Sequence, residues 1–127
     1  MELELSFPGG KQVSARVRGH SILSDQPQDN GGQDAAPTPL ELFAASLASC
    51  SSLYAVAFLQ RKGIDTTGVS ARATAVRDEQ THLITKFTLE FSLPPGFSEE
   101  LKAQMVRAAQ GCLVAKHFEK PPVIEVK

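Results

Sequence analysis

The hydrophobic and polar positions at the start of the chain alternate with a period of two. Residues 1–7 interleave acidic and apolar side chains, and residues 12–18 form a second run after a Pro-Gly-Gly turn. Successive side chains of a strand point to opposite faces, so this pattern predicts a β-hairpin. Residues 24–37 are rich in Asp, Gln, Asn, Gly and Pro, and we expect a mobile loop or lid there.

A long apolar stretch follows and predicts a central helix. Thr38 suits the N-cap, Pro39 the first helical position, and Glu41 the first turn, where the helix dipole favours negative charge. Residues 40–58 are apolar on nearly all sides, and a basic last turn and a glycine end the pattern. We therefore expect a helix that is buried all round, with Cys50 near its middle.

Period two returns between residues 66 and 93. Small apolar residues alternate with polar ones from Val69 to Ala75, and larger ones alternate in phase from Phe87 to Leu93. Polar residues 78–81 join the two runs. An antiparallel pair of strands is the simplest interpretation.

The last third of the chain predicts a second helix and a final strand. Ser98 and two glutamates begin a run with helical spacing that ends at Gly111, and Cys112 follows at once. After a short piece and two prolines, residues 123–126 predict an edge strand.

This order of elements indicates an α+β fold, with antiparallel sheets wrapped around the long helix. A chain of 127 residues is the size of one domain, and we expect residues 1–127 to form it. The predicted sheets carry few large core side chains, which favours a dimer that buries additional apolar surface.

Composition and charge exclude several classes of function. The chain is 42% hydrophobic with a net charge of −1, so we expect neither disorder nor binding to nucleic acid or an anionic membrane. Residues 1–7 lack the basic start and apolar run of a secretory signal, which indicates a cytoplasmic protein. The apolar residues 40–59 include a glutamate and four serines, so a soluble helix is favoured over a membrane span.

The candidate chemistry rests on Cys50 and Cys112. A structural disulfide is not expected, because the cytosol keeps thiols reduced and a domain of this size is stable on its core. Either cysteine could simply be a small core residue, as free cysteines usually are. That alternative is weaker for Cys112, which follows a helix end where Lys116 or His117 could lower its thiol pKa.

Other site classes lack support. Zinc could use both cysteines and the three histidines, but no Cys-x-x-Cys or His-x-x-x-His spacing is present. The chain has no G-x-S-x-G motif, no phosphate-binding glycine loop and no paired-carboxylate signature. We expect no metal and no cofactor.

Two segments resemble the cysteine segments of the OsmC/Ohr proteins. Residues 37–50 read Pro-Thr-Pro-Leu-Glu-Leu-Phe-Ala-Ala-Ser-Leu-Ala-Ser-Cys, and residues 111–116 read Gly-Cys-Leu-Val-Ala-Lys before a Pro-Pro turn. The order of elements agrees over nearly the whole chain. The resemblance implies an intertwined homodimer with thiols at the subunit interface, and peroxide reduction as the activity.

Within that resemblance, each cysteine has a role. Cys50 as a thiolate would attack the O–O bond of an organic hydroperoxide, releasing an alcohol and leaving a sulfenic acid. Cys112 would condense with it to a disulfide, which an external dithiol would reduce.

The resemblance also implies residues around the thiols. Phe43, Leu47 and Phe58 would supply an apolar lining that favours organic hydroperoxides over hydrogen peroxide. The family's arginine, which keeps the nucleophile ionised, corresponds to Arg16 or Arg18.

One position departs from the family's peroxidase pattern. The branches most active on organic hydroperoxides carry glutamate directly after the proline, where this chain has Leu40, and Glu41 comes one step later. One step on a helix turns a side chain by about 100 degrees, so Glu41 would point elsewhere. This difference keeps a second hypothesis open, namely a small-molecule binding or redox-sensing protein with little peroxidase activity.

Overall fold

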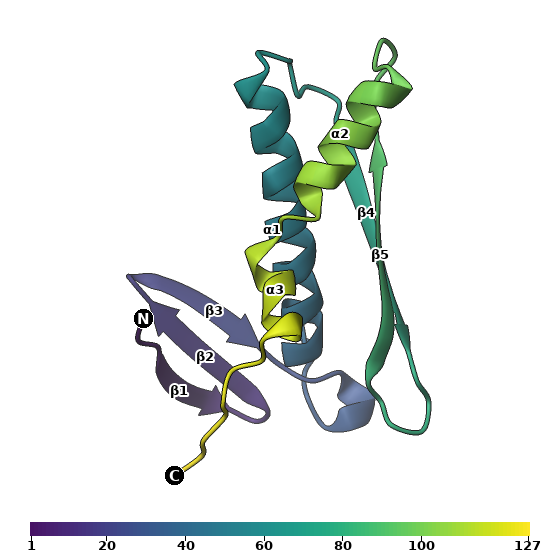
Figure 1. Ribbon diagram of the computed structural model, residues 1–127. Helices are drawn as coiled ribbons and strands as arrows, with labels where there is room; N and C mark the ends of the chain where they lie inside the picture. Colours follow the sequence, from purple (N-terminus) through teal and green to yellow (C-terminus); the bar gives the residue numbers. More distant parts are fainter. The chain divides into compact units, whose positions relative to one another are not determined.

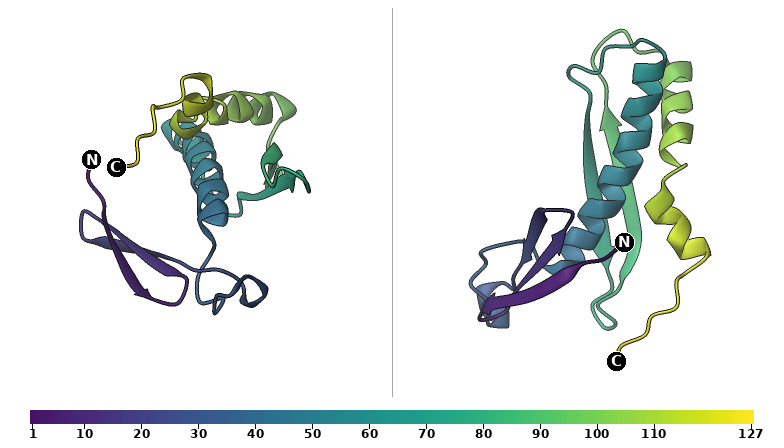
Figure 2. Two further views of the ribbon diagram at one scale, coloured as in Figure 1. Left: turned by 90° about the horizontal axis from the view of Figure 1, so that it is seen from below. Right: turned by 90° about the vertical axis from the view of Figure 1, so that its left-hand side faces the viewer.

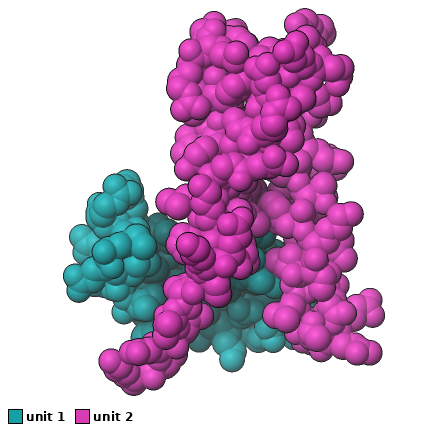
Figure 3. Space-filling model, in the orientation of Figure 1, with its two compact units in different colours: residues 1–45 teal, residues 46–127 magenta.

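The computed structural model of the protein describes residues 1–127. The chain forms two compact units, residues 1–45 and residues 46–127 (Figure 3). The boundary falls inside the long helix α1, Pro39–Arg61. The assignment of residues 1–127 to one domain stays a prediction.

The first unit contains a three-stranded antiparallel sheet. Its strands are β1 (Glu4–Gly9), β2 (Gln12–Val17) and β3 (His20–Ser24), in the order β1-β2-β3 (Figure 1). The predicted hairpin is confirmed, and β3 is a strand that the sequence pattern had not identified.

The turn between β2 and β3 has an unusual backbone. Arg18 and Gly19 both have positive φ angles, 49° and 85°. A two-residue turn of this handedness matches the twist of the strands it joins. Arg18 therefore occupies a conformation that most residues avoid.

The segment between β3 and α1 is a loop, as its composition predicted, and hydrogen bonds hold it together. The buried carboxylate of Asp25 accepts backbone N–H groups from Gln26 at 2.8 Å, Gln33 at 3.2 Å and Ala35 at 3.1 Å. A short 3-10 helix, Gln28–Asn30, lies within the loop. One carboxylate thus closes a loop that has no apolar core of its own.

The second unit combines the rest of α1 with a hairpin and two shorter helices. The hairpin strands β4 (Ser70–Arg77) and β5 (Ile84–Ser92) are antiparallel, as predicted. Helix α2 (Glu99–Ala109) begins after the predicted cap Ser98, whose side chain accepts the N–H of Leu101. Figures 1 and 2 show α2 and then α3 (Leu113–Glu119) following α1 along its length.

The core of this unit lies where α1 meets α2. Ala55 and Leu59 of α1 pack against Met105 and Ala109 of α2, and all four are buried. The expectation that α1 is buried all round is wrong for the single chain, because Leu53 is 66% exposed and only Ala55 and Leu59 are fully covered. One hairpin and two short helices are too few to enclose a helix of 23 residues.

The length and composition of α1 would also allow it to cross a membrane. Core helices of soluble proteins pass the same test, and α1 contributes half of the core cluster. This property is therefore weak evidence for a span.

The predicted edge strand at the C-terminus is not formed. Residues 121–127 have no regular secondary structure, and Val123, Ile124 and Val126 are exposed. A strand needs a partner to receive its backbone hydrogen bonds, and no strand of this chain pairs with the tail. The predicted α+β class, with antiparallel sheets and a long helix, is confirmed.

Candidate functional site

The two cysteines lie in the second unit, on different helices. Cys50 is half-buried in the middle of α1, and Cys112 is the N-cap of α3 with an exposed fraction of 1%. The break after α2 places Cys112 there, because the chain turns at Gly111 before the next helix starts. Both side chains are free thiols.

The sulfur of Cys112 has several polar neighbours. It accepts the N–H of Ala115 at 3.4 Å, and its thiol donates to the carbonyl oxygen of Leu47 at 4.0 Å. The side chains of Ser51 and Cys50 lie close enough to this sulfur to lower its pKa. The structure thus brings the two cysteines together, although they are remote in the sequence.

Two opposing effects act on the thiol of Cys112. Burial is the largest single influence and raises its pKa, because a charged sulfur is costly away from water. The hydrogen bonds from Ser51, Cys50 and the backbone N–H groups of Ala115 and Val114 together outweigh it, so the pKa lies below the usual value. These hydrogen bonds therefore favour the thiolate of Cys112 more than water does for a free cysteine.

An apolar cavity of about 410 Å³ is lined in part by Leu47, Ser51 and Ala115, the neighbours of Cys112. Its wall on β5 consists of Phe87, Leu89 and Phe91, which share one face of the strand because they are two residues apart. Helix α1 and the segments around α2 and α3 complete the lining with Leu47, Ser51, Val106, Ala109, Gln110 and Ala115. The polar side chains among them are Ser51 and Gln110.

The three side chains predicted to line a substrate pocket have different positions. Leu47 lines the cavity beside Cys112. Phe58 instead packs against the core cluster, with the Lys62 ammonium 5.3 Å from its ring centre. Phe43 belongs to the first unit and is 39% exposed.

The alternating pattern predicts that Phe87, Leu89 and Phe91 share one face of β5, but it does not indicate the cavity that they line. Periodicity does not say which helix such a face meets, so the cavity itself was not foreseen.

Glu41 forms a reciprocal cap with Thr38. Its carboxylate accepts the Thr38 backbone N–H at 2.7 Å and the Thr38 hydroxyl at 3.0 Å, and its own N–H donates to that hydroxyl at 3.3 Å. The bonds from the Thr38 backbone and side chain lower the pKa of Glu41. The predicted N-cap at Thr38 is confirmed, and any catalytic part for Glu41 stays a prediction.

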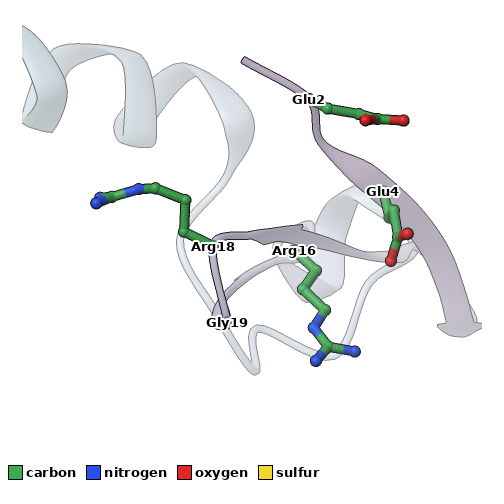
Figure 4. Close-up of a pocket in the computed structure, with 5 residues that line it drawn as sticks. All are labelled: Glu2, Glu4, Arg16, Arg18 and Gly19. Carbon is green, nitrogen blue, oxygen red and sulfur yellow. The ribbon is translucent and has the colours of Figure 1, made fainter.

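The two candidate arginines line a cavity of about 370 Å³ in the first unit, together with Glu2, Glu4 and Gly19. Glu4 and Arg16 are cross-strand neighbours on β1 and β2. Figure 4 shows the guanidinium of Arg18 pointing away from that of Arg16. Activation of Cys50 by either arginine stays a prediction.

His117 and the possible metal ligands contribute no further site. The exposed ring of His117 lies with Nδ1 2.9 Å from the carbonyl oxygen of Leu113, one turn earlier in α3. No group of three or more His, Cys, Asp and Glu side chains converges in a way that would hold a metal ion.

Comparison with known protein families identifies the family of the chain. The family model described as OsmC-like protein matches residues 31–127. The chain belongs to the OsmC-like protein family. The match includes both cysteines of the OsmC-like chain and all of the helices α1 to α3. Comparison with curated proteins finds no significant match.

Solved structures share the fold of this OsmC-like chain. A candidate osmotic stress induced and detoxification response protein from Psychrobacter arcticus is 25% identical with a TM-score of 0.80, covering 90% of this chain and 85% of its own. The organic hydroperoxide resistance protein OsmC from Legionella pneumophila is 19% identical with a TM-score of 0.60, covering 93% and 89%. An organic hydroperoxide resistance protein from Elizabethkingia anophelis is 24% identical with a TM-score of 0.55, covering 100% and 93%.

Proposed function

We propose that this protein is a thiol-dependent peroxidase that reduces organic hydroperoxides to alcohols. The observation that carries the proposal is the proximity of the Cys50 and Cys112 side chains, next to residues that line an apolar cavity. A pair of reducible thiols with an adjacent apolar space is the minimum that such a reaction needs.

The difference in exposure between the two thiols supports the roles that we propose for them. Cys50 is half-buried and open to a substrate, whereas Cys112 is almost completely covered. Cys50 attacks the O–O bond as a thiolate, an alcohol leaves, and the sulfur becomes a sulfenic acid. Cys112 then forms the disulfide with Cys50 and water is released, and an external dithiol restores both thiols.

The substrate class rests on the cavity and on the family. Phe87, Leu89 and Phe91 favour an apolar organic group over the small and polar hydrogen peroxide. The relatives from Legionella pneumophila and Elizabethkingia anophelis are named as organic hydroperoxide resistance proteins, which supports the same class at the level of the family.

The active form is an intertwined homodimer in the cytoplasm. Many large apolar side chains are exposed in the single chain, among them Leu53 on α1 and Ile124 in the tail, and a partner subunit would cover them. Arg16 or Arg18 serves as the cation that keeps Cys50 ionised.

Peroxide consumption with purified, fully reduced protein tests the proposal. With cumene hydroperoxide and saturating dithiothreitol, the wild type consumes peroxide steadily and Cys50→Ser consumes none. In Cys112→Ser, the sulfur of Cys50 reacts once and is then overoxidised by further peroxide. Ser49→Ala, an exposed change on the same helix, serves as the control. Steady turnover by Cys50→Ser would overturn the proposal.

A second candidate function is small-molecule binding or redox sensing without efficient turnover. Leu40 stands where the family's active branches have glutamate, and the carboxylate of Glu41 is engaged by Thr38. Under this alternative the peroxide rate would equal that of a free thiol, while a ligand would raise the melting temperature of the reduced protein.

A further inference from the structure

The residue directly after Cys50 belongs to the surroundings of the other cysteine. Ser51 is half-buried on α1, one helical turn after Leu47, so the two share a face of the helix. Both line the cavity, and the Leu47 carbonyl oxygen lies 4.0 Å from the sulfur of Cys112. Ser51 thus lies on the part of α1 that is next to the Cys112 sulfur.

The Cys112 thiol depends on hydrogen bonds for its ionisation. Ser51 lies on the same face of α1 as Leu47, whose carbonyl oxygen is 4.0 Å from this sulfur, and its side chain lowers the pKa of the Cys112 thiol. The N–H of Ala115, at 3.4 Å, is part of the α3 backbone and no side-chain change removes it. Ser51 is therefore the side chain through which the state of Cys112 can be altered without changing either cysteine.

We propose that Ser51 is a positioning residue for the second half of the cycle, donating its hydroxyl to the Cys112 sulfur so that this buried thiol attacks oxidised Cys50 as a thiolate. The inference rests on the proposed peroxidase function and adds the group that controls resolution. In this step an S–S bond forms and the S–O bond of the Cys50 sulfenic acid breaks. The departing hydroxide takes up a proton and becomes water.

The test compares Ser51→Ala with Ser51→Thr, which keeps a hydroxyl, and with Ser49→Ala, which removes an exposed hydroxyl from the same helix. One equivalent of cumene hydroperoxide is added without reductant. Rapid quenching and mass spectrometry then follow Cys50 sulfenic acid and the disulfide separately. The thiolate absorbance of Cys112 is titrated in a Cys50→Ser background, with and without Ser51→Ala.

We expect disulfide formation from the sulfenic acid to slow about tenfold in Ser51→Ala, the factor of one charge-assisted hydrogen bond. Sulfinic acid on Cys50 accumulates under excess peroxide, Ser51→Thr restores most of the rate, and the titration of Cys112 moves to higher pH. Ser49→Ala matches the wild type.

The outcomes separate this inference from the function on which it rests. A wild-type protein that forms neither sulfenic acid nor disulfide would remove both proposals. Normal disulfide formation in the wild type, with the same resolution rate and Cys112 titration in Ser51→Ala, would overturn the role of Ser51 and leave the peroxidase proposal intact.

Discussion

Thr38 and Glu41 form reciprocal hydrogen bonds at the first turn of α1. The Glu41 carboxylate accepts two hydrogen bonds from Thr38, at 2.7 and 3.0 Å, and the Glu41 N–H donates to the Thr38 hydroxyl at 3.3 Å. This reciprocal pair fills backbone donors that the start of a helix leaves open. It also determines where the helix carrying Cys50 begins.

Removing the Thr38 hydroxyl should destabilise the protein. We expect Thr38→Ala to lower the free energy of unfolding by about 1 kcal/mol, the usual loss for a helix cap, and Thr38→Ser to restore it. Chemical denaturation followed by circular dichroism measures the change. Equal midpoints for Thr38→Ala and wild type would show that the cap contributes nothing.

Asp25 should make the stability of the protein fall in acid. Hydrogen bonds from the backbone N–H groups of Gln26, Ala35 and Gln33 lower its pKa. A carboxyl whose folded pKa lies below its unfolded value, about 3.9, stabilises the fold above that value and loses the contribution as pH falls through the folded pKa. Thermal unfolding between neutral pH and pH 2.5 should therefore show a smaller acid loss for Asp25→Asn than for wild type.

The exposed Asp29, in the same loop, supplies the matched control for that experiment. Asp29→Asn should follow the wild-type acid curve. If Asp25→Asn also follows it, the buried carboxylate does not hold the loop in the way its hydrogen bonds indicate.

The β5 wall of the cavity should determine which peroxide is preferred. Replacing Leu89 by Asn puts a polar group into the apolar lining, and we expect kcat/KM for cumene hydroperoxide to fall roughly tenfold, the value of one buried apolar side chain. The value for hydrogen peroxide should change far less. Leu83→Asn alters an exposed leucine outside the cavity and is the control. Equal losses of kcat/KM for both peroxides would show that the organic substrate binds outside this cavity.

The exposed apolar tail should contribute to self-association. We expect the wild type to have twice the 13.6 kDa mass of the chain in multi-angle light scattering, because Ile124 and Val126 need cover. Ile124→Glu combined with Val126→Glu should shift the protein towards monomer at micromolar concentration. Glu125→Gln, which alters a charged residue of the same tail without adding charge, is the control. A wild-type mass equal to that of a single chain would contradict the dimer.

Local patterns in the sequence were sufficient for most elements. Alternation along β1, β2, β4 and β5 predicted both hairpins, because the side-chain period of a strand is visible in any isolated segment. The caps of α1 and α2 were also predicted, since a cap depends on residues within one turn of each other.

The pattern failed where an element depends on its neighbours. The tail over residues 123–126 alternates like a strand, but alternation supplies no partner for its backbone. Composition predicted the loop after β3, but it did not indicate the buried carboxylate of Asp25 that organises this loop. Neither outcome can be read from nearest neighbours in the chain.

The sequence by itself determined most of the helices and strands, that one cysteine lies in the long helix and the other directly after a later helix, and which family the chain resembles. Only the tertiary structure decided that Cys112 lies against Ser51 and Leu47, and that one face of β5 closes the cavity beside them. The reason is physical. Periodicity and caps arise from interactions within a few residues, whereas the neighbours of a buried sulfur depend on how whole helices and strands pack.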